Sequence, residues 1–266
     1  WGDLRLGEPK GAFEDLLWAA LLDPQCGLSM AQTAEKLAEK YGITREEADE
    51  VAYRSQQRAK QAWDEGRFDA EIAPVTIRSR KGETHFRTDE HMRPETTMEV
   101  LATLRPYFKE DGLVTAGNAS GIGDGAAAVV ISSDAWAERN GVRPIGRLVA
   151  WGIAGVDPSI MGIGPAPAAR KALEKAGLSL DDMDLVDINE AFAPQFAAVA
   201  RELELDPEKT NVNGGAIAIT HPLAASGTRI TVNLLHELQR RGARYGLGGA
   251  CIGGGQGIAV IVEALP

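Results

Sequence analysis

Cysteine is scarce in this sequence, which has only Cys26 and Cys251 among its 266 residues. Neither lies in a spacing typical of a zinc or iron–sulfur site, and two cysteines cannot form the disulfide framework of a small secreted protein. The scarcity therefore predicts no metal site and a reducing compartment. We expect a cytoplasmic protein.

Long hydrophobic runs are also missing. No stretch approaches the roughly 20 apolar residues of a membrane-spanning helix, and there is no signal-peptide pattern. Hydrophobic residues make up 44% and charged residues 25%, as in an ordinary globular protein. The sequence thus predicts no membrane association and a chain long enough for one large core or two modest domains.

Positive charge is in short supply, since 28 Lys and Arg stand against 38 Asp and Glu for a net charge of −10. This balance argues against general nucleic-acid binding, and an anionic ligand would need a local basic site. The first residue is Trp rather than Met. We therefore expect a processed, cleaved or truncated chain.

The sequence does contain a glycine-rich region, residues 211–257, with one histidine and one cysteine set among small residues. His221 lies in the first cluster, Cys251 lies in the second, and a helical pattern over 225–241 separates them. Glycines let another backbone or a ligand approach closely, and those after Cys251 leave N–H groups uncovered, as an oxyanion site needs. Taken alone, however, a cysteine in such a turn is more often a packed core residue.

A third polar cluster, residues 187–193, follows a strand pattern at 185–188 and leads into a helix expected to begin near Glu190. Open α/β sheets place their chemistry at the carboxyl ends of strands. Asn189 and Glu190 are therefore candidate functional residues, with a helix cap and a first-turn charge as the alternatives.

Four dispersed motifs together resemble the thiolase family, the acyl-CoA acyltransferases that make or break a carbon–carbon bond between thioesters. They occur in the family's order and span essentially the whole chain: residues 115–121 (TAGNASG), 189–192 (NEAF), 214–227 around His221, and 251–255 (CIGGG).

The resemblance implies an α/β layered fold with two βαβαβαββ halves and a loop domain inserted in the first. Residues 1–122 correspond to the loop domain, 123–142 to the last strand and helix of the first half, and 143–266 to a complete second half. The alternating strand and helix patterns of the second half independently indicate an α/β layer. The strand of the first half is expected at residues 126–132.

The family's nucleophilic cysteine lies in the first half, upstream of the loop domain, and this sequence does not contain that region. Cys26 lies in DPQCGLS, which does not resemble the nucleophile's motif. We therefore expect a second polypeptide or a cleaved N-terminal piece to supply the nucleophile. An unpaired sheet edge at 126–132 would otherwise be a liability. The family also implies a dimer or tetramer of the full unit.

The resemblance assigns four catalytic residues. His221 activates the nucleophilic thiol, and Cys251 is the general acid or base at the α-carbon of acetyl-CoA. Asn189 orients a water that helps stabilise the enolate or oxyanion, and Gly253 supplies an oxyanion N–H. For His221, the alternative is a capping or core histidine beside Pro222.

Coenzyme A and acyl-CoA are the implied substrates, with no metal or redox cofactor. Ser120 corresponds to a pantetheine or phosphate contact, and Arg93 to an arginine near the nucleotide phosphates, although a lone loop arginine can simply be solvated. Five further residues correspond to apolar positions that line the pantetheine tunnel, unless they only pack in the core: Leu21, Met30, Ala116, Met161 and Phe192.

Some residues depart from the family pattern. Thr220 and Ala224 stand where glycines are usual, and Gly123 replaces a common asparagine; Ser29 and Ala31 replace a histidine and a glycine. The added Cβ atoms beside His221 bear on rate and substrate range.

The sequence predicts a thiolase that cleaves 3-ketoacyl-CoA or condenses acetyl-CoA. The alternatives are a non-catalytic thiolase-like scaffold or acyl-CoA-binding subunit and, third, a ketoacyl-synthase-type condensing enzyme.

Overall fold

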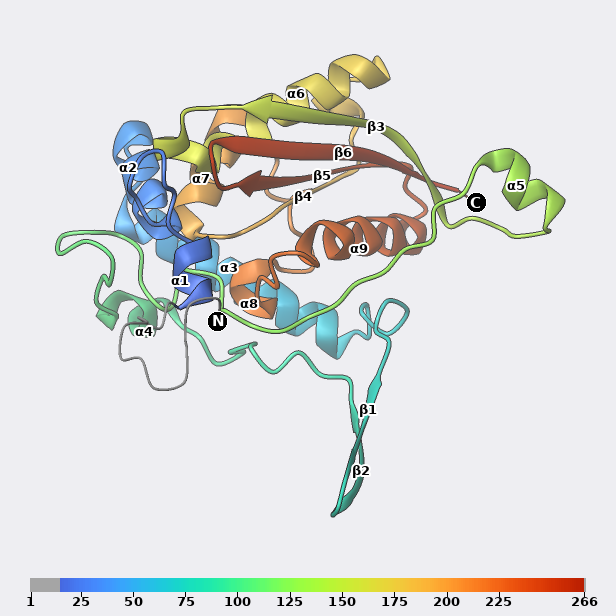
Figure 1. The fold of residues 1–266 in the computed structure, drawn as a ribbon, viewed down its shortest axis with the longest axis horizontal. Helices are drawn as coiled ribbons and strands as arrows, with labels where there is room; N and C mark the ends of the chain where they lie inside the picture. The colour runs from blue at the N-terminus through green and yellow to red at the C-terminus, as the bar shows by residue number, and fades with distance from the viewer. Residues whose placement is uncertain (1–14, 266) are drawn as a thin grey trace, which may run out of the picture.

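A four-stranded sheet lies between two helices in the computed structural model, which describes residues 15–265 (Figure 1). The strands, in spatial order, are β3 (Gly146–Gly155), β6 (Gln256–Ala264), β5 (Tyr245–Ile252) and β4 (Leu185–Ile188). The β3–β6 and β6–β5 pairs are antiparallel, whereas β4 and β5 run parallel. Helices α6 (Pro165–Ala176) and α9 (Ser226–Arg241) cover opposite faces. The predicted α/β layer is thus confirmed.

Glycines in β5 bring α9 close to the sheet. Alternate residues of a strand face opposite sides; accordingly, a Cβ on Gly248 would lie 2.8 Å from Cγ2 of Ile230 on α9, while Leu247 packs in the core of the other face. The apolar stripe predicted on this helix is buried against the sheet at Ile230, Leu234 and Leu238. The strand that carries Cys251 and the helix that follows His221 are therefore packed closely against each other.

Helices from the first half of the chain complete the body: α2 (Met30–Tyr41) and α3 (Arg45–Asp64) pack against α7 (Ala193–Leu203). The sequence Thr-Arg-Glu-Glu at residues 44–47 predicts a capping box. The box is present, because Thr44 Oγ1 accepts from the Glu47 N–H and the Glu47 carboxylate accepts from the Thr44 N–H. Ser29, whose residue type favours a helix cap, caps α2. No helix within residues 15–265 is long and apolar enough to cross a membrane.

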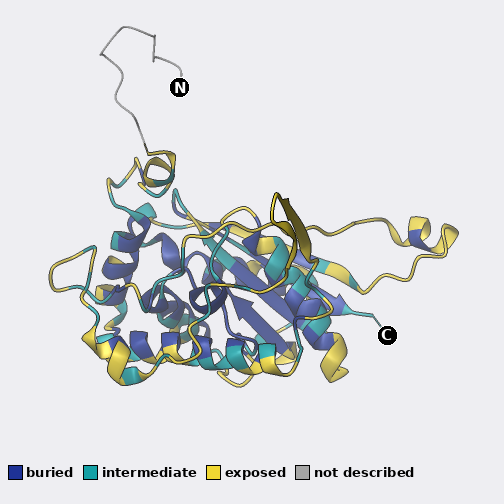
Figure 2. Cartoon of the chain, turned by 90° about the horizontal axis from the view of Figure 1, so that it is seen from below, coloured by how far each residue is buried: buried dark blue, intermediate teal, exposed yellow. Residues whose placement is uncertain are grey.

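The expected strand at residues 126–132 is wrong. These residues belong to an exposed arm, residues 122–145, that runs out to the short helix α5 (Asp134–Arg139) and back (Figures 1 and 2). Val130 is 95% exposed. Strand pairing needs a neighbouring backbone, and neither sheet of the described residues includes this segment. Residues 126–132 do have the apolar pattern of a strand, but no other strand of the described residues pairs with them.

The polar sequence of residues 84–97 predicts mostly loop, and residues 87–97 are loop. Just before them, β1 (Val75–Ser79) and β2 (Gly82–Phe86) form an exposed hairpin that projects from the body (Figure 1). Residues 211–213 have a pattern that predicts a strand, but they form none; beside β4 there is an isolated bridge between Val186 and Thr210. Two short helices complete the described elements before the arm: α1 (Leu16–Ala20) and α4 (Met98–Thr103).

Gly257 on β6 makes the closest backbone approach in the sheet layer. A Cβ there would lie 2.0 Å from the carbonyl carbon of Gly164, directly before α6. We expect Gly257→Ala to lower the free energy of unfolding by about 3 kcal/mol, because backbone cannot move aside as a side chain can. Urea unfolding measures this. The matched control is Gly155→Ala on β3, where a Cβ meets nothing within 4 Å; equal effects of the two changes would contradict the packing.

Candidate active site

Asn189 lies at the carboxyl end of β4. Its backbone N–H donates to the carbonyl of Gly249 on β5 at 2.8 Å, and its side-chain Nδ2 lies 3.3 Å from Nε2 of His221. The residue is 1% exposed, and its Oδ1 has no hydrogen-bond partner within the described chain. Helix α7 begins only at Ala193, with Phe192 as its cap, so the alternative of Asn189 as a helix cap is wrong.

His221 is held through both ring nitrogens. Nδ1 lies 2.6 Å from Oγ of Ser226, the first residue of α9, and Oγ of Ser226 also reaches the carbonyl of Pro222. With the Asn189 amide donating to Nε2, the proton of a neutral ring lies on Nδ1. Burial lowers the pKa of His221 to about 4, and the positive charge of Arg229 adds to the effect. The ring is therefore neutral at pH 7 and can accept a proton on Nε2.

Cys251 lies near the end of β5, opposite Gly257 of β6. β4 pairs with β5 as far as Ile188 and Gly249, and Cys251 is two residues further along. A strand rises about 3.3 Å per residue, so Cys251 lies at the same sheet edge as Asn189. Burial raises the pKa of the Cys251 thiol to about 12. The thiol keeps its proton at pH 7 and is suited to donate it.

A glycine turn joins β5 to β6 directly after Cys251. Gly254 and Gly255 have φ angles of 79° and 76°, which non-glycine residues rarely adopt. The N–H of Gly254 donates to Oδ2 of Asp23 at 2.8 Å, which fixes the turn from a segment far away in the sequence. Gly253 lies beside Met30, since a Cβ on Gly253 would be 3.4 Å from the Met30 sulfur.

Glu190 is buried next to the site and connects the segments that surround it. Its buried carboxylate accepts hydrogen bonds from Ser55 Oγ at 2.6 Å and from Asn211 Nδ2 at 2.9 Å, and burial raises its pKa. A Cβ on Gly215 would lie 2.4 Å from the carboxyl carbon of Glu190. Glu190 thus joins α3, the end of β4 and the loop that leads to His221. The alternative of a first-turn helix charge is wrong, because the helix begins three residues later.

Several of the residues predicted to bind coenzyme A lie on segments that contact one another near the start of α2. Ser120 donates its backbone N–H to Ala191 at 3.0 Å, and Phe192 packs in a cluster with Ala31 of α2. The N–H of Met30 donates to the carbonyl of Leu21 at 2.9 Å. The remaining two predicted lining residues differ in burial: Met161 is buried, and Ala116 is exposed.

Arg93 is placed differently. Its Nη1 donates to the carbonyls of Glu90, His91 and Met92 at 3.0–3.1 Å, within its own exposed loop. Its backbone N–H donates to Gln56 of α3. The predicted nucleotide-phosphate contact of Arg93 stays a prediction.

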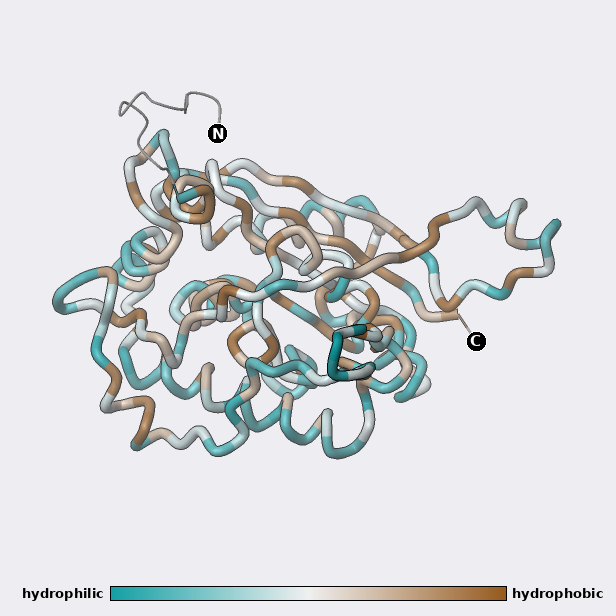
Figure 3. Tube along the Cα trace, turned by 60° about the horizontal axis from the view of Figure 1, so that its bottom comes forward, coloured by the Kyte–Doolittle hydropathy of each residue, from teal (hydrophilic) through white to brown (hydrophobic). Residues whose placement is uncertain are grey.

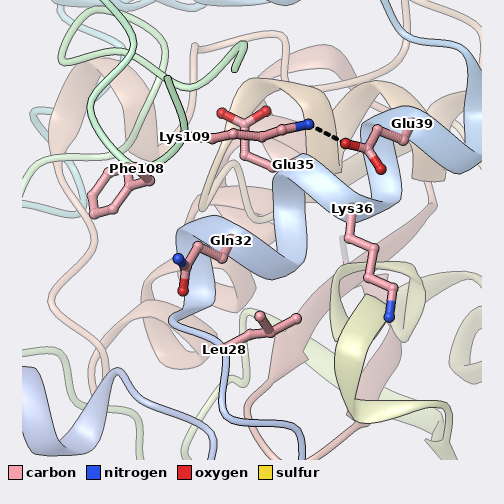
Figure 4. Close-up of a pocket in the computed structure, with 7 residues that line it drawn as sticks. All are labelled: Leu28, Gln32, Glu35, Lys36, Glu39, Phe108 and Lys109. Carbon is pink, nitrogen blue, oxygen red and sulfur yellow. Dashed lines mark hydrogen bonds and ion pairs between the residues drawn. The ribbon is translucent and has the colours of Figure 1, made fainter. Parts of the chain in front are cut away.

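A shallow pocket of about 290 Å³ lies on the outer face of α2 (Figure 4). Lys109 and Glu39 form an ion pair there, and Glu35 accepts from the backbone N–H groups of Leu113 and Val114. Its charged groups thus have protein partners. None of the predicted site residues lines it, so it is separate from the candidate active site.

Three supporting residues were missed by the sequence reasoning. Ser226 lies inside the motif around His221, so its spacing of five residues was the available signal. Asp23 and Ser55 gave no signal in the sequence, because their partners are far away along the chain. Asp23 is 231 residues from Gly254, and Ser55 is 135 residues from Glu190. Such contacts depend on tertiary packing, which local patterns do not encode.

Cys251 is expected to resist alkylation. With its pKa raised from 9.0 to about 12, the thiolate fraction at pH 8 falls by a factor of about 1000. Iodoacetamide should therefore label Cys251 in the folded protein far more slowly than in urea, as peptide mass spectrometry reports, and the rate should rise with pH beyond 9. Equal rates in the folded and unfolded protein would show that the thiol is not held protonated by its surroundings.

The fold is of the thiolase type, as comparison with known proteins shows. Residues 142–264 match the thiolase C-terminal domain and residues 6–135 match the thiolase N-terminal domain. The chain belongs to the thiolase family.

The similar proteins include 3-ketoacyl-CoA thiolases and acetyl-CoA acetyltransferases. The chain is 56% identical over 265 residues to human mitochondrial 3-ketoacyl-CoA thiolase and 54% identical over 268 residues to an acetyl-CoA acetyltransferase of Syntrophomonas wolfei. The matches cover 98% and 100% of this chain and 67% of each relative. The crystal structure of the human enzyme superposes with a TM-score of 0.92 at 54% identity, covering 99% of this chain and 67% of that one. The chain thus spans about two-thirds of its relatives' length.

Proposed function

We propose that the chain is the larger part of a thiolase, an acyl-CoA C-acyltransferase that cleaves 3-ketoacyl-CoA with CoA or condenses acetyl-CoA units. A further N-terminal portion, as a second polypeptide or a cleaved piece, supplies the nucleophilic cysteine. One observation carries the proposal: the contact of Asn189 with a half-buried, neutral His221 at the sheet edge that also presents Cys251.

His221 is the base of the first step. The nucleophile's thiol gives its proton to Nε2 of His221, and the thiolate attacks the β-carbonyl carbon of the substrate. The bond between the α- and β-carbons then breaks, and its electron pair stays on the acetyl-CoA fragment as an enolate. With a pKa of about 4, the imidazole is unprotonated at the start of this step.

Cys251 is the acid that follows. Its protonated thiol gives a proton to the α-carbon of the enolate, which releases acetyl-CoA. The thiol of free CoA then attacks the acyl thioester and gives its proton to the Cys251 thiolate. The nucleophile leaves as a thiolate and regains its proton from His221. Condensation is the reverse sequence, and the covalent intermediate predicts ping-pong kinetics.

Backbone and amide groups stabilise the oxyanions. The Gly253 N–H lies in a turn that Asp23 and the adjacent glycines hold in shape, as a preorganised donor requires. Asn189 is buried and has an unpartnered Oδ1 that is suited to hold a water near His221. Both roles follow the family pattern, and each rests on the position of the residue at this sheet edge.

The arm is the proposed docking surface for the N-terminal portion. Figure 3 shows hydrophobic stretches of the chain on both branches of the arm. Several of its apolar side chains are exposed: Ile122, Val129, Val130, Ile131, Trp136, Val142 and Ile145. A groove of about 1190 Å³ lies between the arm, α9 and the β5–β6 part of the sheet. A portion that paired with residues 126–132 would bury these side chains and provide the strand partner that they lack.

Coenzyme A binding is proposed for the segments around α2. One solved relative, the human mitochondrial enzyme, is described in complex with CoA and superposes with a TM-score of 0.91. The proposed contacts are Ser120, Phe192, Leu21, Met30, Met161, Ala116 and, at the nucleotide phosphates, Arg93. The reaction needs no metal or redox cofactor, and we propose a dimer or tetramer of the full unit. The cytoplasmic location stays a prediction, because the relatives include mitochondrial and bacterial proteins.

The test is CoA-dependent loss of 3-ketoacyl-CoA by this chain combined with the N-terminal third of the unit. Acetoacetyl-CoA and longer 3-ketoacyl-CoA substrates are compared, and parallel double-reciprocal lines are expected. A complex that assembles and binds CoA without turnover would favour the alternative of a non-catalytic scaffold or acyl-CoA-binding subunit.

A further inference from the structure

A glycine strap, residues 121–125 (Gly-Ile-Gly-Asp-Gly), lies against the backbone around His221. Alternate residues of an extended segment face one side, and here Gly123 and Gly125 face the segment 220–222. A Cβ on Gly123 would lie 2.7 Å from Oγ1 of Thr220, and a Cβ on Gly125 would lie 2.7 Å from Cγ of Pro222. Asp124, between them, is exposed. The strap therefore lies against Thr220 and Pro222 at Gly123 and Gly125.

Thr220 has an unusual backbone conformation. Its φ of 74° and ψ of 167° fall where β-branched residues are rarely found. Such a conformation persists only when the surroundings hold it. Two contacts do so: Thr220 Oγ1 donates to the carbonyl of Gly121 at 2.7 Å, and the His221 N–H donates to the same carbonyl at 3.2 Å.

The side chain of Thr220 also fills the space beside Gly123. A Cβ on Gly123 would meet both Oγ1 and Cγ2 of Thr220, at 2.7 and 3.2 Å. The chain thus has room for a side chain at position 220 or at position 123, but not for both. Because residue 220 directly precedes the histidine, this choice bears on where the imidazole lies.

We propose that Thr220 is a positioning residue for His221. Its side chain and the glycine strap form one energetically coupled contact, which we call the seat. The seat holds the backbone of residues 220–221 so that the ring stays between Asn189 and Ser226. The importance of the seat for turnover rests on the proposed function, but the seat itself does not.

The coupling between Thr220 and Gly123 can be measured through the melting temperature of the protein. Gly123→Ala is expected to lower the melting temperature of the assembled protein by about 5 °C in the parent, because the added methyl meets Thr220. The same change in a Thr220→Gly background is expected to cost little. An equal cost in both backgrounds would overturn the coupled seat.

The His221 ring reports the positioning. The chain has four histidines, so ¹³C-histidine labelling with His221→Gln for assignment gives a resolvable signal. Thr220→Val keeps the shape but loses the hydrogen bond to Gly121. We expect the pKa of His221 to rise from about 4 toward its usual 6.5 as water reaches the ring, with Thr220→Ser restoring the parent titration. An unchanged titration in Thr220→Val would contradict the proposal.

The matched control is Thr231→Val on α9, where an exposed Thr hydroxyl donates to the carbonyl of Gly227 at 2.8 Å. It loses the same kind of bond and should leave the His221 signal unchanged. In an active protein, Thr220→Val should also lower kcat about tenfold, the equivalent of one hydrogen bond, with little change in KM. A shifted titration in a protein without turnover would retain the seat and reject the proposed function, so the two failures can be told apart.

Discussion

Replacing His221 by alanine is expected to lower kcat of the assembled protein by about 10²–10⁴-fold, the range of a lost general base. The imidazole is half-buried, neutral and hydrogen-bonded at both nitrogens, to Asn189 and Ser226. Alanine leaves the nucleophile's thiol with no base in this chain's site. The measurement is steady-state cleavage of acetoacetyl-CoA, together with the burst of acyl-enzyme formed after rapid mixing.

The matched control is His85→Ala, because His85 lies on the exposed hairpin and pairs with Thr76. Its activity should equal that of the parent. A His221→Ala protein that folds and retains more than about a tenth of the parent rate would contradict the assignment of His221 as the base.

Replacing Cys251 by serine is expected to separate the two chemical steps. Acylation of the nucleophile by acetyl-CoA requires no removal of an α-hydrogen, so it should remain measurable. Exchange of the α-hydrogens of acetyl-CoA with deuterated solvent should fall about 10²–10⁴-fold, because the group that moves that proton is lost. Mass spectrometry follows both the acyl-enzyme and the deuterium content of acetyl-CoA.

Cys26→Ser is the control for the thiol exchange. Cys26 lies in the loop that Asp23 organises, and its backbone N–H donates to Asp23 Oδ1 at 3.3 Å. The substitution keeps that backbone contact, so exchange should be unchanged. Parent-like deuterium exchange in Cys251→Ser would assign the α-proton to a different group.

The elements with local signals were predictable from the sequence. Thr44 and Glu47 mark the start of α3 through their mutual hydrogen bonds, and the apolar spacing of α9 marks the face that the sheet buries. The association of Asn189 and His221 was expected only from the family resemblance. The structure adds that Nδ2 and Nε2 lie 3.3 Å apart.

The remainder depended on tertiary contacts. Residues 126–132 have a strand-like apolar pattern, but a pattern cannot state whether a partner strand is present. Asp23 reaches the Gly254 N–H from the other end of the chain. Thr220 and Gly123 stood as two separate departures from the family pattern. The structure shows them in contact, so that the larger residue at one position occupies the room left by the smaller at the other.

The measurement that tests the central claim most directly locates the acyl group. The assembled protein is mixed with acetyl-CoA, quenched in acid and examined by intact and peptide mass spectrometry. We expect one acetyl group on a cysteine of the N-terminal portion, with Cys26 and Cys251 unmodified and no adduct in His221→Ala. An acetyl group on Cys251 or Cys26, or no adduct in an assembled and CoA-binding parent, would contradict the account.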